Sequence, residues 1–117
     1  MQEQSFLSRE KEGQLAVDVI ETFKEIIIQT AIAGVKPDDV HIHVTSDVIT
    51  IRGERKSPDY PPDATHHFEE CFWGAFSRSI ILPHHINPDL AQADFTDGVL
   101  TLTLPKIIGE KEITLSL

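Results

Sequence analysis

A hairpin is encoded by the stretch Ala93-Asp94-Phe95-Thr96-Asp97-Gly98-Val99-Leu100-Thr101-Leu102-Thr103-Leu104-Pro105. Glycine adopts a positive φ without a steric clash and aspartate tolerates one, so Asp97-Gly98 predicts a two-residue turn. Beyond the turn, leucines alternate with threonines, which is typical of a strand with one buried face. Pro105 has no backbone N–H and should end that strand. No residue in this stretch suggests catalysis.

Short strands are predicted along most of the remaining chain. Residues 15–20 and 25–33 are rich in apolar and β-branched side chains. Apolar residues alternate with polar ones over 40–44 and again from Ile49 to Gly53, after Thr45-Ser46-Asp47, which predicts a hairpin. Three prolines within 55–66 predict a long loop, after which apolar residues return over 68–82. Because no helical period extends beyond a turn or so, the pattern predicts an all-β fold, an immunoglobulin-like antiparallel β-sandwich.

Composition limits the possible partners. The chain has 117 residues, enough for one domain with a single core. Its 19 acidic and 10 basic residues give a net charge of −9, so we expect no nucleic acid and no membrane as a partner. The lone Cys71 excludes an internal disulfide, and the first residues lack the basic and apolar regions of a secretory signal. A cytoplasmic location is therefore expected.

Further motifs follow one another in the order of a known family. They are Val17-Asp18-Val19-Ile20-Glu21, Ala33-Gly34-Val35, Ile49-Thr50-Ile51-Arg52-Gly53-Glu54-Arg55, Gly74-Ala75-Phe76-Ser77-Arg78, Leu82-Pro83, and Ala93 with Gly98-Val99-Leu100. This succession over residues 15–106 resembles the α-crystallin domain of small heat shock proteins, in a bacterial or archaeal type with a very short N-terminal arm. Two positions depart from the family pattern, because Ala33 replaces a usual proline and Cys71 a frequent arginine.

The resemblance implies three parts and a function. Residues 1–14 would form the short arm, 15–106 the α-crystallin domain, and 107–117 a C-terminal extension with an Ile-x-Leu anchor, Ile113 and Leu115. The implied function is an ATP-independent holdase chaperone of the stress response, which binds partly unfolded client proteins and prevents their aggregation. Such work needs no catalytic residue, cofactor or metal, so we expect none of these and no enzyme. The implied partners are clients and other copies of the chain, in a dimer or a higher oligomer.

A dimer loop is the first implied contact surface. In bacterial members of the family a loop exchanges a strand between partners, and here that loop covers 56–65, including Tyr60, Pro61 and Pro62. The prolines disfavour a long regular strand, although an edge strand that lacks a few donors still pairs.

An apolar groove that receives the anchor is the second implied surface. Ile113 and Leu115 share one strand face, and burying both is worth about 3 to 6 kcal/mol before ordering costs, weak enough for subunit exchange. The groove is expected between strands 40–44 and 90–95 of a neighbouring copy. Its candidate residues are Val40, Ile42, Val44 and Leu90.

Other motif residues are expected to be structural: Ala93, Gly98, Val99, Leu100, Gly74, Phe76 and Arg78. Arg78 shares a strand face with Phe76, so we expect partial burial and a carboxylate partner. Phe72 and Trp73 fit either the core or a dimer contact, of which the core is favoured, and we expect Cys71 to be a partly buried structural thiol and not a redox sensor.

Three alternatives stay open. A related CS-type co-chaperone sandwich would dock on a larger chaperone as an interaction module, and an assembly-deficient subunit would act with longer partners. His41 and His43 share a strand face that could bind a metal, but no Cys, Asp or Glu set accompanies them at a recognised spacing, so solvent-facing histidines are favoured. Glu69 and Glu70 would point to opposite faces of a strand and form no acid–base couple.

Overall fold

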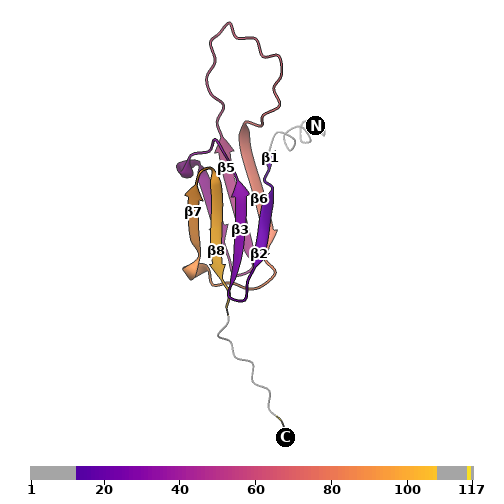
Figure 1. Ribbon diagram of the computed structural model, residues 1–117, viewed down its shortest axis with the longest axis vertical. Coiled ribbons are helices and arrows are strands. Elements are labelled where there is room, and N and C mark those ends of the chain that lie inside the picture. Colours follow the sequence, from indigo (N-terminus) through magenta and orange to yellow (C-terminus); the bar gives the residue numbers. More distant parts are fainter. Residues whose placement is uncertain (1–12, 108–115, 117) are drawn as a thin grey trace, which may run out of the picture.

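Two four-stranded sheets stack into a sandwich in the computed structural model, which describes residues 13–107 and 116 (Figure 1). The strands are β1 (Gly13–Gln14), β2 (Val17–Glu21), β3 (Glu25–Ala31), β4 (Val40–Val44), β5 (Val48–Arg55), β6 (Gly74–Ile81), β7 (Gln92–Thr96) and β8 (Val99–Pro105). Two 3-10 turns, η1 (Pro37–Asp39) and η2 (Pro88–Leu90), precede β4 and β7. No helix in the described part of the chain is long and apolar enough to cross a membrane.

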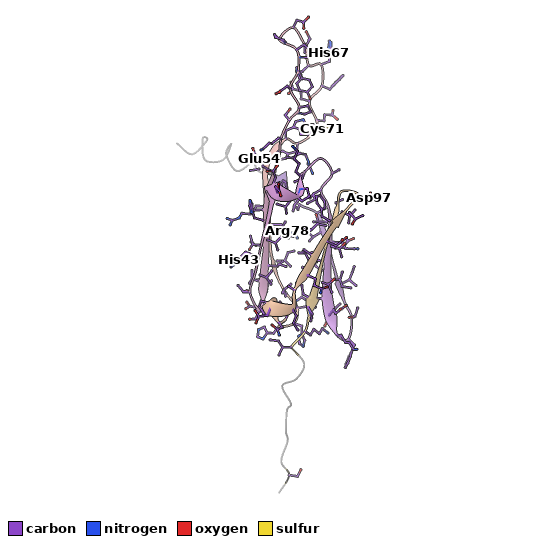
Figure 2. All side chains as sticks on the ribbon, turned by 90° about the vertical axis from the view of Figure 1, so that its left-hand side faces the viewer. His43, Glu54, His67, Cys71, Arg78 and Asp97 are labelled. Atoms are coloured by element: carbon purple, nitrogen blue, oxygen red, sulfur yellow. The ribbon has the colours of Figure 1, made fainter. Side chains whose placement is uncertain are left out.

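The strand order is β1-β6-β5-β4 in one sheet and β2-β3-β8-β7 in the other. All neighbouring strands pair antiparallel except β1, which runs parallel to β6. The predicted all-β antiparallel sandwich is therefore confirmed. Because β4 and β7 are the last strands of their sheets, they lie together at one open edge of the sandwich, which faces the viewer in Figure 2.

The core lies between the sheets and is built mainly from the strand residues that face inward, which are every second residue along a strand. Ile26 and Ile28 of β3 are fully buried, and their neighbours across the ladder, Leu104 and Leu102 of β8, are equally enclosed. The facing sheet contributes Ile49, Ile51 and Phe76. The alternation of leucine with threonine thus places one apolar face of β8 in the core, as predicted.

The hairpin between β7 and β8 has the predicted two-residue turn. Asp97 and Gly98 both have positive φ, 53° and 77°, and Thr96 pairs with Val99 directly across the turn. Positive φ at both central positions is the type I′ geometry that matches the twist of antiparallel strands. The backbone N–H of Ile32 donates to the Gly98 carbonyl at 2.7 Å, which ties the turn to the end of β3.

The loop between β5 and β6 is longer than predicted. It covers residues 56–73 and projects beyond one end of the sandwich (Figure 1), whereas apolar residues from 68 onward were expected to form a strand. Phe68 is 85% exposed, so this apolar residue does not belong to the core as a buried strand residue would. The segment before β7 also differs, because Leu90 belongs to η2 and the strand begins at Gln92.

Candidate functional site

An apolar groove lies between the edge strands β4 and β7. It has a volume of about 160 Å³ and is lined by Pro37, Val40, Ile42, Ala93, Asp94, Phe95 and Leu100. Leu100 is only 3% exposed. A charged side chain, Asp94, stands on the β7 side, where its carboxylate accepts a hydrogen bond from the Thr96 hydroxyl at 2.9 Å. The groove therefore offers an apolar surface with a single acidic residue.

The alternation in β4 places apolar side chains on the groove side. Val40 and Ile42 are half-buried and pack against the core, while His41 and His43 are exposed. Figure 2 shows His43 on the outer face of the sheet. Within residues 13–107, each edge strand has one hydrogen-bonded neighbour, so its other edge presents backbone donors and acceptors that no described strand pairs with. An added extended segment would find both backbone partners and apolar contacts at this edge.

Two of the four predicted groove residues line this groove. Val40 and Ile42 do so, whereas Val44 packs against the core further along β4, and Leu90 is 56% exposed on η2. The sequence analysis missed Phe95, which also lines the groove. The two-residue turn at Asp97-Gly98 sets the register that pairs Phe95 with Leu100, and this register could have identified it. The anchor residues Ile113 and Leu115 lie outside the described residues.

The loop that carries Tyr60, Pro61 and Pro62 is exposed along residues 56–71. The Tyr60 ring meets the His66 ring edge-on at a centroid distance of 4.7 Å, and His66 Nδ1 lies 3.9 Å from a Glu69 carboxylate oxygen. These contacts connect the two arms of the loop. Figure 2 shows His67 and Cys71 on this loop, outside the body of the sheets.

A second open edge lies at β2. Among the strands that the structure describes, β2 pairs with β3 alone, and its residues Val19 and Ile20 are each 42% exposed. An unpaired strand edge with exposed apolar side chains is a surface that a monomer normally covers.

Several structural expectations need correction. Within residues 13–107, Arg78 has no carboxylate partner; its Nη1 donates to the Leu15 carbonyl at 2.5 Å, because the link from β1 to β2 passes beside β6. Cys71 is exposed and not partly buried as expected, and Trp73 is 39% exposed and lies outside the core in which it was expected. Phe72 is half-buried near the end of the loop.

The other motif residues lie in the core, at the start of a strand, beside the groove or next to the turn. Phe76 is in the core, and Gly74 opens β6 with a φ of 128°, a region that favours glycine. Ala93 borders the groove, and Val99, 37% exposed, follows the turn.

The histidines and acids form no recognisable chemical site in the described region. Among residues 13–107 and 116, no group of three or more metal-binding side chains gathers. Glu69 and Glu70 lie on the loop rather than on a strand, so the predicted opposite facing does not apply to them.

Fold and groove together define a class of β-sandwich proteins with an apolar groove between open sheet edges. A family model described as the Hsp20/alpha crystallin family matches residues 8–116. The chain belongs to this family, the small heat shock proteins, as its motifs suggested. The CS-type co-chaperone alternative is not favoured by these comparisons.

Individual relatives agree with this assignment. Small heat shock protein C4 of Rickettsia felis is 32% identical over 89 residues, which cover 76% of this chain and 55% of the relative. Heat shock protein 16 of Schizosaccharomyces pombe is 33% identical over 105 residues, 86% of this chain and 73% of that protein. The solved structure of heat shock protein 16.0 from Schizosaccharomyces pombe aligns with a TM-score of 0.75 and 32% identity, covering 90% of this chain and all of that one.

The chain is shorter than several of these relatives. It spans 55% of Small heat shock protein C4 and 64% of Small heat shock protein C2, both of Rickettsia felis.

Proposed function

We propose that this chain is an ATP-independent holdase that binds partly unfolded proteins and keeps them from aggregating. The observation that carries the proposal is the apolar groove between β4 and β7, whose outer edges pair with no strand in the described part of the chain. Aggregating chains expose apolar side chains and unpaired strands, and the groove offers partners for both. The net charge of −9 would keep the protein–client complex dispersed.

Assembly would use the same groove. Ile113 and Leu115, two residues apart, would share one face in an extended segment and could insert together beside Val40 and Ile42 of a neighbouring copy. The anchor and a client segment would then compete for one surface. A moderate anchor affinity lets a client displace it.

Dimerisation would use the loop and the edge of β2. The exposed loop projects away from its own sheets, and β2 presents Val19 and Ile20 at an edge that no described strand covers. A short extended piece of the loop from one copy would pair with β2 of the other and cover these apolar side chains. We propose a dimer built in this way, within the cytoplasm, with neither nucleic acid nor membrane as a partner.

Substitutions in the groove test the proposal. Val40→Thr keeps the side-chain shape and Ile42→Thr removes one heavy atom, so together they make the groove polar and should weaken suppression of client aggregation. His41→Ser with His43→Ser changes the outer face of the same strand and should leave suppression unchanged. Equal suppression by both double variants, with unfolding midpoints above the assay temperature, would refute a role for the groove.

A further inference from the structure

Arg55 lies at the base of the loop and touches three segments of the chain. It is the last residue of β5, and its register partner is Gly74, the first residue of β6. Its Nε donates to the Ala33 carbonyl at 2.8 Å, and its Nη1 donates to the Phe72 carbonyl at 3.4 Å. The two ends of loop 56–73 therefore meet at this one side chain.

The Ala33 contact connects the loop to the opposite sheet. Ala33 lies in the connection that leaves β3, whereas Arg55 belongs to the sheet that contains β4, β5 and β6. Gly34 follows with a φ of +84°, and a Cβ on it would lie 3.8 Å from both Cδ and Nε of Arg55. The arginine thus lies along this turn and bridges the sheets at the end where the loop emerges.

The planar guanidinium suits this place. Two of its N–H groups point to two different carbonyls, and its Cζ lies 6.0 Å from the centre of the Phe76 ring. The neighbouring cation, Lys56, makes one ion pair with the described residues, an exposed 3.9 Å contact with Asp39 that holds a segment weakly. Of these two basic residues, Arg55 is the one with the geometry to fix the loop.

We propose that Arg55 is a positioning residue that fixes the direction in which loop 56–73 leaves the sandwich, and that it thereby sets the affinity of the dimer. The second part rests on the proposed dimer; the first part does not. A loop with a fixed base loses less conformational freedom when it docks on a second copy, so a firm base favours association.

Hydrogen exchange of the full chain tests the first part. Arg55→Lys keeps the charge but cannot reach both carbonyls, so the paired amides at the loop end of the β5–β6 ladder, over 53–55 and 74–76, should exchange about tenfold faster. Exchange in β3 and β8 should keep its wild-type rate. Arg52→Lys, on the exposed face of the same strand, is the matched control and should change neither region.

Sedimentation equilibrium tests the second part. The dimer dissociation constant should rise about tenfold in Arg55→Lys and stay at the wild-type value in Arg52→Lys. An equal dissociation constant in all three proteins would overturn the link to the dimer.

Two exchange results would overturn the positioning role: unchanged rates in Arg55→Lys, or rates raised throughout both sheets, which indicate general destabilisation. A wild-type protein that stays monomeric refutes the proposed dimer instead, and the exchange comparison still decides the role of Arg55.

Discussion

Gly53 occupies a position where β5 leaves no space for a side chain. A Cβ there would lie 2.5 Å from Cζ of Phe76 and 2.6 Å from the carbonyl oxygen of Asp39. One of these neighbours is a core ring and the other is backbone, so neither can move without disturbing the sandwich. The glycine in the Gly53-Glu54-Arg55 motif therefore has a packing function.

We expect Gly53→Ala to lower the free energy of unfolding by about 1 to 3 kcal/mol, because the added methyl group overpacks this contact. Urea denaturation measures the change, with Glu54→Ala at the exposed neighbouring position as the control. A loss in Gly53→Ala no larger than that in the control would contradict the packing role.

A second residue-scale feature is the ion pair between Glu21 and Lys106. The Lys106 Nζ lies 2.6 Å from the Glu21 carboxylate, and the lysine side chain is 9% exposed. The hydrogen bond from Lys106 lowers the pKa of Glu21 below its ordinary value of 4.5. Since the folded-state pKa is the lower one, the pair stabilises the fold above pH 4.5, and this contribution disappears as the pH falls through the lowered pKa.

Glu21→Gln should therefore reduce the thermal unfolding midpoint at pH 7, and the difference from wild type should shrink as the pH falls below 4.5. Differential scanning fluorimetry over a pH series measures this, with Glu54→Gln as the control. A difference between variant and wild type that stays constant across the series would contradict the assigned cause.

The β7–β8 hairpin shows how an element is specified by its turn. Gly98 has a φ of +77°, and a Cβ on it would lie 3.3 Å from Cα of Ala33. Gly98→Ala should cost about 1 to 2 kcal/mol of unfolding free energy, through both backbone strain and this contact. Asp97→Asn should be nearly neutral in the same chemical denaturation, since asparagine tolerates positive φ. Equal stability of Gly98→Ala and wild type would contradict this account of the turn.

Elements with local signals were predictable from the sequence, and those that depend on distant contacts were not. The alternation of apolar and polar residues in β4, β5 and β8 predicts which side chains are buried, and Asp97-Gly98 predicts the turn. By contrast, the apolar residues after 66 predicted a strand, yet none of the strands described over 13–107 pairs with residues 68–73. Likewise, the partner of Arg78 is the Leu15 carbonyl, which β1 and the following link bring into reach.

The candidate site was predictable to a similar degree. The parity of β4 identified Val40 and Ile42, but the placement of Leu90 depended on where β7 begins. Pro88 and the Asn87 cap start η2, and the Asn87 side chain accepts from the Asp89 N–H at 3.0 Å. That local turn delays the strand and moves Leu90 away from the groove.

At the scale of the whole molecule, the surface proposed for dimerisation is separate from the groove proposed to bind the anchor of a neighbouring copy. The loop projects from one end of the sandwich, while the groove follows the β4–β7 edge. We expect Ile113→Ala with Leu115→Ala to reduce the particle mass in multi-angle light scattering to that of a dimer, because only the anchor contact is lost. Lys111→Ala, on the same extension, should leave the mass unchanged. An unchanged mass in the double variant would contradict the role of the anchor.

Suppression of client aggregation is the most direct test of the central proposal, that this chain holds unfolded protein without ATP. The measurement is light scattering from a heat-labile client at its unfolding temperature, with an equimolar amount of the chain and no nucleotide. We predict strongly reduced scattering that added ATP does not change. Scattering equal to that of the client alone would contradict the holdase function.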